Sequence, residues 1–300
     1  MNNLLKRTLV LVTVLFLLSA CADLVKPIET SDLQVTVSIP PQAWLVKRIA
    51  GDLVSVQTMV GPGDDPHTYE PTPAQMVALT KTDIYFTIGI EFEEAWMPKL
   101  ANSNRMMRVV ASDFGVQRIA STPALEATAT TSNGNVYEGQ DPHIWYSPER
   151  MKLIARTIAK ELASFNPQNK ATYQANLEQV ISEIDRLQTE VSANLTGLPR
   201  DHFLIIHPTL GYLADDYGLV QIAVESEGQE PGPEALIALI KKARENQVSA
   251  VFYQKGNNIK VAESIARQIG ASQLFEIDSM PEDWPAGLMH AVDALKEALQ

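Results

Sequence analysis

The chain has 300 residues and a formal net charge of −12, with 36 acidic against 24 basic residues. This length is enough for two domains of ordinary size, and the acidic balance disfavours nucleic acid or an anionic lipid surface as a partner. The only cysteine is Cys21, so the fold contains no intramolecular disulfide and depends on packing or a ligand for its stability.

The N-terminus has the pattern of an export signal. Lys6 and Arg7 precede the apolar run "TLVLVTVLFLLSA", which is too short for a comfortable membrane span. The run ends in "LSAC" at Cys21 and resembles the lipobox of bacterial lipoproteins, which implies an acylated Cys21 anchored to a membrane. The alternative is an ordinary signal peptide that ends at an accidental cysteine. We expect a signal peptide at 1–21 and a polar tether at 22–32; removal of the signal gives a net charge of 22 − 36 = −14.

The first half of the mature chain alternates between strand and helix patterns. Thr72 and Ser147 each precede a proline and can cap the helix that follows. Alternation at this spacing predicts a parallel sheet covered by helices on both faces. The predicted strands are 33–40, 54–60 and 84–89, and the predicted helices are 41–51, 74–81 and 148–162. Residues 121–140 are small and polar, and we expect an exposed loop there.

A long amphipathic helix is predicted after Pro167. Its apolar residues fall three or four apart over about 30 residues, which corresponds to roughly 45 Å. A helix of that length fits a rigid connection between two lobes better than an element inside one lobe. The apolar residues are Tyr173, Leu177, Val180, Ile181, Ile184, Leu187, Val191 and Leu195.

The second half repeats the α/β alternation, although we find no internal repeat in the sequence. The predicted fold is therefore α/β, with an N-terminal lobe at 33–165, a linking helix at 166–199 and a C-terminal lobe at 200–300. Two such lobes behind an export signal are typical of a solute-binding protein. The predicted strands are 203–207, 248–254 and 273–278, and the predicted helices are 210–218, 234–247, 260–270 and 286–300.

Three of the five histidines lie where a ligand would bind. In open parallel sheets, ligands bind beyond the carboxyl ends of the strands. His67 follows the strand at 54–60, His143 lies in a loop before a helix, and His207 ends the strand at 203–207. His202 is about 16 Å away at the opposite end of that strand, and His290 lies in the C-terminal helix, so we expect neither at the site.

These histidines and Asp278, at the end of the last strand, form a natural four-ligand set for zinc. Neighbouring prolines restrict each histidine, since Pro66, Pro142 and Pro208 flank them. The alternative is that the histidines only form hydrogen bonds to the backbone, because no local motif of two nearby histidines supports a metal site.

Four segments resemble the zinc- and manganese-binding solute-binding lipoproteins of ABC transporters, the ZnuA/TroA-like family. They are "GDDPHTYEPTP" (63–73), "DPHIWYSP" (141–148), "IIHPTLGYLADDYGL" (205–219) and "IGASQLFEIDSM" (269–280). The resemblance implies two lobes joined by one long helix, with a metal in the cleft between them. It also implies that the metal ligands are His67, His143, His207 and Asp278, and that the partner is a membrane permease.

The third ligand position bears on which metal is bound. Relatives specific for manganese tend to have a carboxylate there, whereas zinc-binding relatives tend to have a histidine, so His207 favours zinc. Zinc transporters of the family often carry a histidine-rich loop between the first two ligands, and 121–140 contains no histidine. Manganese therefore remains the alternative cargo. Gln254 stands where relatives often have an acidic residue, and we assign it no ligand role.

Several side chains are candidates to support the ligands. Asp65, Glu70 and Asp141 could accept a hydrogen bond from a histidine ring, and the alternative is that they are solvated loop acids. Trp145 and Tyr146 could line the cleft or simply pack in the core.

We expect a monomeric, extracytoplasmic, lipid-anchored receptor in the periplasm or at the cell surface, and no enzyme. A zinc-dependent hydrolase with Glu70 as its base, a receptor for an organic solute, and a role in cell adhesion remain open alternatives. Four protein ligands leave no open position for catalysis, which favours transport.

Overall fold

The computed structural model describes residues 33–61, 63–64, 66, 68–121, 139–225, 231–256 and 258–300. The predicted signal peptide, Cys21 and the tether lie outside the described residues, as do Asp65, His67 and most of the loop predicted at 121–140. In the described part, no helix is both long and apolar enough to span a membrane.

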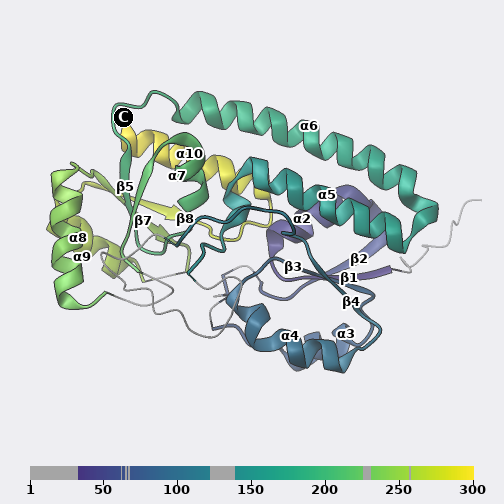
Figure 1. The fold of residues 1–300 in the computed structure, drawn as a ribbon. Helices are drawn as coiled ribbons and strands as arrows, with labels where there is room; N and C mark the ends of the chain where they lie inside the picture. The colour runs from purple at the N-terminus through teal and green to yellow at the C-terminus, as the bar shows by residue number, and fades with distance from the viewer. Residues whose placement is uncertain are drawn as a thin grey trace, which may run out of the picture. The chain divides into compact units, whose positions relative to one another are not determined.

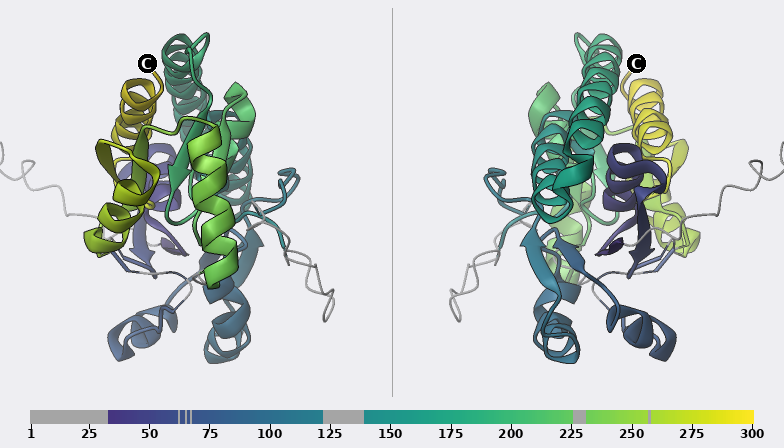
Figure 2. Two further views of the ribbon diagram at one scale, coloured as in Figure 1. Left: turned by 90° about the vertical axis from the view of Figure 1, so that its left-hand side faces the viewer. Right: turned by 90° about the vertical axis from the view of Figure 1, so that its right-hand side faces the viewer.

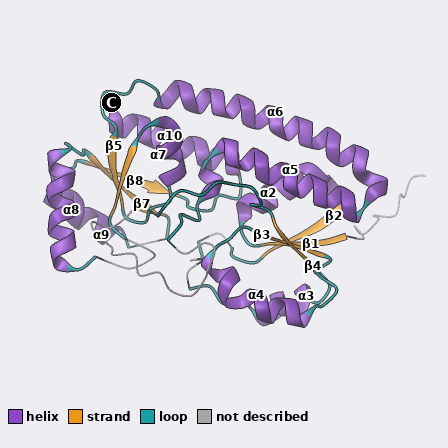
Figure 3. Ribbon diagram, viewed as in Figure 1, coloured by secondary structure: helices purple, strands orange, loops and turns teal. Residues whose placement is uncertain are grey.

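Two four-stranded sheets, both entirely parallel, form the centres of the two lobes (Figures 1 and 3). Their strand orders, β2-β1-β3-β4 and β6-β5-β7-β8, are the same relative to the chain. The two halves thus repeat one topology, although their sequences show no repeat. The strands of the first sheet are β1 (Leu33–Val37), β2 (Val54–Thr58), β3 (Ile84–Thr87) and β4 (Arg108–Ala111); those of the second are β5 (His202–Ile205), β6 (Val220–Ala223), β7 (Ala250–Gln254) and β8 (Gln273–Ile277).

Helices cover both faces of the first sheet, as Figure 2 shows. The helices α2 and α5 lie on one face and pack against each other, while α3 and α4 lie on the other. The elements of this lobe are α2 (Pro40–Ala50), the short helix η1 (Gly51–Leu53), α3 (Pro73–Leu79), α4 (Glu91–Ser103), η2 (Ile144–Tyr146) and α5 (Pro148–Phe165).

The long helix α6 (Lys170–Leu195) follows η3 (Pro167–Asn169) and leads from the first lobe to the second. It has 26 residues and extends about 39 Å, somewhat less than the sequence predicts. One side packs against α2 and α5 of the first lobe and α10 of the second (Figure 1). The long connecting helix is thereby confirmed, and both lobes are packed against it.

The second sheet is also covered on both faces. The helices α8 and α9 pack against each other on one face, and α10 packs against β5 and β8. The helices are α7 (Gly211–Tyr217), α8 (Pro233–Glu245), α9 (Ile259–Ile269) and α10 (Trp284–Leu299).

Helix starts follow the predicted capping chemistry. The Oγ1 of Thr72 accepts a hydrogen bond from the backbone N–H of Gln75, and the Oγ of Ser147 accepts one from the backbone N–H of Arg150. Each cap is followed by a proline at the first helical position, where the missing N–H has no cost. Among the α-helices and strands that the structure describes, three were not predicted, namely α4, β4 and β6. The strands β4 (RVVA) and β6 (VQIA) each include a charged or amide side chain, whereas the equally short β3 and β5 lie within longer apolar runs. The helix α4 contains Pro98.

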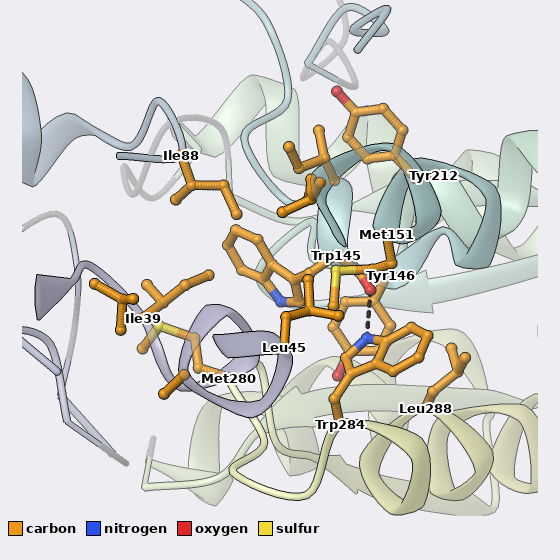
Figure 4. Packing of buried hydrophobic residues seen from close by; sticks show 14 of the residues in the cluster. Ile39, Leu45, Ile88, Trp145, Tyr146, Met151, Tyr212, Met280, Trp284 and Leu288 are labelled. Atoms are coloured by element: carbon orange, nitrogen blue, oxygen red, sulfur yellow. Dashed lines mark hydrogen bonds between the residues drawn. The ribbon is translucent and has the colours of Figure 1, made fainter. Parts of the chain in front are cut away.

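One hydrophobic cluster contains buried side chains from both sheets and from α6. Trp145, Tyr146 and Trp284 are among its largest members, and each is at most 1% exposed. Figure 4 shows these rings packed among Leu45 of the first lobe and Leu288 of the second. The lobes therefore share a core instead of meeting only through solvated surfaces.

Candidate metal centre

His143 and His207 come from different lobes and meet at one point. Their Nε2 atoms lie 3.2 Å apart, and the two ring planes are nearly perpendicular, at 85°. Both side chains are buried, at 4% and 5% exposed. His207 lies just beyond the carboxyl end of β5, where ligands of parallel sheets are expected, whereas His143 lies in a loop just before η2 and was selected for that position.

Asp141 holds His143 from the side opposite to this meeting point. Its Oδ1 accepts a hydrogen bond from the backbone N–H of His143 and faces the ring Nδ1, both at 2.8 Å. The carboxylate is only 2% exposed, so this pair is shielded from water. Its Oδ2 is buried and has no hydrogen-bond partner in the described part of the chain.

Glu225 stands in the same relation to His207. Its Oε2 lies 3.3 Å from the Nδ1 of His207, and its side chain is 20% exposed. Glu225 was not among the predicted site residues. It lies two residues beyond β6, so the strand-end rule would have found it if that four-residue strand had been recognised.

The carboxylates of Asp141 and Glu225 determine which nitrogen of each histidine ring carries the hydrogen. A carboxylate accepts but cannot donate, so each Nδ1 carries the ring hydrogen in the neutral imidazole. Each Nε2 then presents a lone pair, and two lone pairs face each other across 3.2 Å. Such a contact is repulsive unless a proton or a cation lies between the nitrogens. The arrangement is therefore suited to hold a cation that prefers imidazole nitrogen.

Asp278 follows β8 directly, and its carboxylate lies near a lysine. Its Oδ2 is 3.6 Å from the Nζ of Lys255, and its Oδ1 accepts a hydrogen bond from the backbone N–H of Met280 at 3.1 Å. Among the residues that the structure describes, no three histidine, cysteine or acidic side chains converge as a metal-binding group. The structure thus brings His143 and His207 together, but not Asp278 with them, and His67 lies outside the described residues.

The segment that follows His143 is joined to the segment that follows β8. The indole N–H of Trp145 donates to the carbonyl of Ser279 at 2.8 Å, and the hydroxyl of Tyr146 donates to the carbonyl of Asp278 at 2.6 Å. In the other direction, the indole N–H of Trp284 donates to the carbonyl of Trp145 at 2.6 Å, the dashed bond in Figure 4. Burial and the nearby carboxylate of Asp278 raise the pKa of Tyr146, so its hydroxyl keeps the proton that it donates.

Trp145 also touches the ring of His143, with ring centroids 5.2 Å apart in an edge-to-face arrangement. Two roles were considered for Trp145 and Tyr146, lining the cleft or packing in the core. Both side chains are buried in the shared hydrophobic cluster, so core packing is observed for both. His202 pairs with exposed Asp201, and His290 faces the carbonyl of Glu276, so neither joins the centre.

A surface cavity of about 620 Å³ is bordered by described residues on both sides of His67 in the sequence, among them Asp64 and Thr68. Tyr69 donates its hydroxyl hydrogen to the side chain of Gln75 at 2.6 Å, and its ring packs edge-on against Phe92. Glu70 is exposed and lines this cavity.

Comparison with known proteins identifies the family of this chain. The family model of "Zinc-uptake complex component A periplasmic", ZnuA, matches residues 35–298. The chain belongs to the ZnuA family. It is 25% identical to the high-affinity zinc uptake system protein ZnuA of Bacillus subtilis (strain 168), with 95% of this chain and 97% of that protein covered. It is 28% identical to the iron ABC transporter substrate-binding lipoprotein MtsA of Streptococcus pyogenes serotype M1, with 87% and 85% covered.

Solved ZnuA structures share the fold. A ZnuA deletion mutant with zinc bound is 38% identical, with a TM-score of 0.81 over 89% of this chain and 98% of that one. A second ZnuA crystal structure is 39% identical, with a TM-score of 0.80 over 89% and 99%. The predicted family and two-lobe fold are thereby confirmed. As a ZnuA-family member, the chain is the metal-binding component of an ABC-type metal uptake system.

Proposed function

We propose that this protein captures zinc outside the cytoplasm and delivers it to an ABC-transporter permease. Its ligands would be His67 and His143 from the N-terminal lobe, and His207 and Asp278 from the C-terminal lobe. Manganese is the alternative cargo. Since four protein ligands would close the coordination shell, the site binds and releases metal and catalyses no reaction.

The observation that carries the proposal is the meeting of two Nε2 lone pairs 3.2 Å apart. Zinc–nitrogen bonds of 2.0–2.1 Å at a tetrahedral angle put two ligand nitrogens about 3.4 Å apart. The separation of His143 from His207 fits a shared zinc with little movement. A carboxylate behind each ring is also the usual arrangement for a zinc-bound histidine.

In this proposal, the carboxylate of Asp278 leaves its contact with Lys255 and binds the metal instead. The 3.6 Å contact between its Oδ2 and the Nζ of Lys255 is long, and the lysine is 62% exposed, so the exchange costs little. An N-terminal lipid at Cys21 and a monomeric state complete the proposal. The tether at 22–32 would then connect the anchor to β1.

A competitive titration of the mature protein with zinc and manganese tests the proposal. We expect one zinc per chain, and a loss of affinity of roughly 100-fold or more in both His207→Ala and Asp278→Ala, because each removes a direct ligand. His202→Ala is the matched control, since it removes a histidine from the other end of β5 and should bind zinc normally.

Acid should weaken binding in the wild type, since protons compete with zinc for the imidazole nitrogens. Affinity that is unchanged between pH 7.5 and 5, or equal in His207→Ala and His202→Ala, would overturn the four-ligand site. Tighter binding of manganese than of zinc would select the alternative cargo.

A further inference from the structure

Glu93 is a buried carboxylate for which the proposed metal site has no use. It lies in the first turn of helix α4 and is only 6% exposed. Its Oε1 accepts hydrogen bonds from the hydroxyl of Ser38 at 2.5 Å and the backbone N–H of Ile88 at 2.8 Å. Its Oε2 accepts one from the backbone N–H of Gly89 at 2.7 Å. These three donors come from the ends of two neighbouring strands, so Glu93 joins β1 and β3 where both approach the site.

One arm of this network leads to the segment that contains His67. The backbone carbonyl of Ser38 accepts a hydrogen bond from the backbone N–H of Val60 at 2.9 Å, where that segment begins. Phe92, next to Glu93, packs against Tyr69, two residues beyond His67, with ring centroids 5.3 Å apart.

The other arm leads to His143 through Arg118. The guanidinium of Arg118 donates to the carbonyls of Ile88 and Gly89, the same two residues whose N–H groups bind Glu93. It also donates to the backbone carbonyl of Asp141 at 3.4 Å. The carboxylate of Asp141 in turn holds the ring of His143.

We propose that Glu93 is a positioning residue for the metal site, and that it fixes Val60 and Tyr69, which lie on either side of His67 in the sequence, relative to the Asp141–His143 segment. This inference rests on the proposed function. The tie is strongest when Glu93 is ionised, because only a carboxylate accepts all three hydrogen bonds fully. A protonated Glu93 has to donate to an acceptor, and the Ser38 hydroxyl can receive that hydrogen while donating its own to Tyr85, whose hydroxyl lies 3.0 Å away.

The surroundings make this ionisation relevant at physiological pH. Burial is the main cause that raises the pKa of Glu93 to about 7, and the nearby Asp113 adds to it. Tyr85 on β3 faces the group as a neutral phenol, since burial raises its own pKa. Arg118 is paired with Asp113 at 2.9 Å, so its charge is largely neutralised there.

The test compares zinc affinity at pH 6 and pH 8 for the wild type, Glu93→Gln and Asp83→Asn. Asp83 is the matched control, because its Oδ2 accepts a backbone hydrogen bond from Gln34 at the opposite end of the same sheet. We expect Glu93→Gln to bind zinc roughly tenfold more weakly than the wild type at pH 8, with a smaller difference at pH 6, where the wild-type side chain is protonated. By linkage, zinc should lower the pKa of Glu93 by about 1.

Arg118→Lys is the second variant, since it retains the charge but loses the planar fork that reaches three carbonyls. It should also bind zinc more weakly at pH 8. For each variant, the zinc affinity at pH 8 is divided by that at pH 6. If this ratio is the same for Glu93→Gln and Asp83→Asn, the inference is wrong even if zinc binding itself is normal. If the wild type and Asp83→Asn bind no metal, the proposed function fails and the inference fails with it.

Discussion

The two carboxylate–histidine pairs differ in how firmly they hold their rings. Asp141 makes two contacts of 2.8 Å to His143 and is 2% exposed, whereas Glu225 lies 3.3 Å from His207 and is 20% exposed. A hydrogen bond to a charged group gains strength as water is excluded. His143 is thus the more rigid ligand candidate and His207 the more adjustable one.

Glu225→Gln should weaken zinc binding by about tenfold. Glutamine occupies the same volume and can still accept the ring hydrogen, but it lacks the charge that makes His207 a stronger donor to the metal. The thermal midpoint of the metal-free protein should stay the same, because the side chain is partly exposed and not part of the core. Isothermal titration with zinc measures the loss.

Glu263→Gln is the control for this prediction, since it removes one negative charge from the exposed surface of α9 in the same lobe. Equal zinc affinity in Glu225→Gln and Glu263→Gln would mean that Glu225 does not support His207.

At the level of elements, α7 packs unusually close to the segment that carries His143. A Cβ atom at Gly211, the first residue of α7, would lie 2.3 Å from the Oδ2 of Asp141. The hydroxyl of Tyr212, the next residue, donates to the carbonyl of Asp141 at 2.6 Å. The absence of a side chain at Gly211 is therefore what lets Asp141 reach its position behind His143.

Gly211→Ala should displace Asp141 and lower zinc affinity by tenfold or more, with a loss of roughly 1–3 kcal/mol of stability from overpacking. Gly218→Ala at the other end of α7 is the control. Gly218 has a φ of +69°, and a methyl group there would meet no atom of the described residues within 4 Å, so alanine adds only backbone strain of about 1 kcal/mol. Zinc titrations of both variants measure the effect. Equal zinc affinities of Gly211→Ala and Gly218→Ala would show that a side chain at Gly211 does not displace Asp141 from His143.

The elements also show what the sequence could predict. Alternating strand and helix patterns and proline after a capping residue were enough for the two-lobe fold. The position of His207 at the end of a strand and of His143 in the loop before a capped helix were enough to select these two histidines. Glu225 was missed because β6 reads VQIA, in which Gln221 interrupts the apolar residues, so no continuous apolar run marked it as a strand. The contacts of Asp278 with Lys255 and Tyr146 could not be predicted, since they depend on how the shared core around Trp145 and Trp284 sets one chain segment against another.

At the scale of the molecule, the continuous core has a thermodynamic consequence. One hydrophobic cluster includes Phe86 of the first sheet, Val180 of α6 and Phe252 of the second sheet. Separating the lobes would expose this apolar surface, so we expect residues 33–300 to unfold in one cooperative transition. A free energy of unfolding is then well defined for the whole protein and can be followed against pH.

Glu93 should make that free energy fall as the pH rises from about 4.5 to above 7. The pKa of Glu93 is raised from 4.5 to about 7 in the folded protein, so the folded state binds a proton more tightly than the unfolded state does. The contribution is favourable and fully present below pH 4.5, and it is lost as the pH rises through 7. Its full size is at most about 3 kcal/mol.

Glu93→Gln removes this dependence, because its amide does not titrate. The difference in free energy of unfolding between the wild type and Glu93→Gln, measured in urea without metal at several pH values, isolates the contribution of this one group from those of all others. We expect the free energy of unfolding of the wild type to fall relative to that of Glu93→Gln as the pH rises from 5 to 8. A difference that stays constant over this range would show that Glu93 has the same pKa in the folded and the unfolded protein. Its protonation could then not be linked to zinc binding near neutral pH.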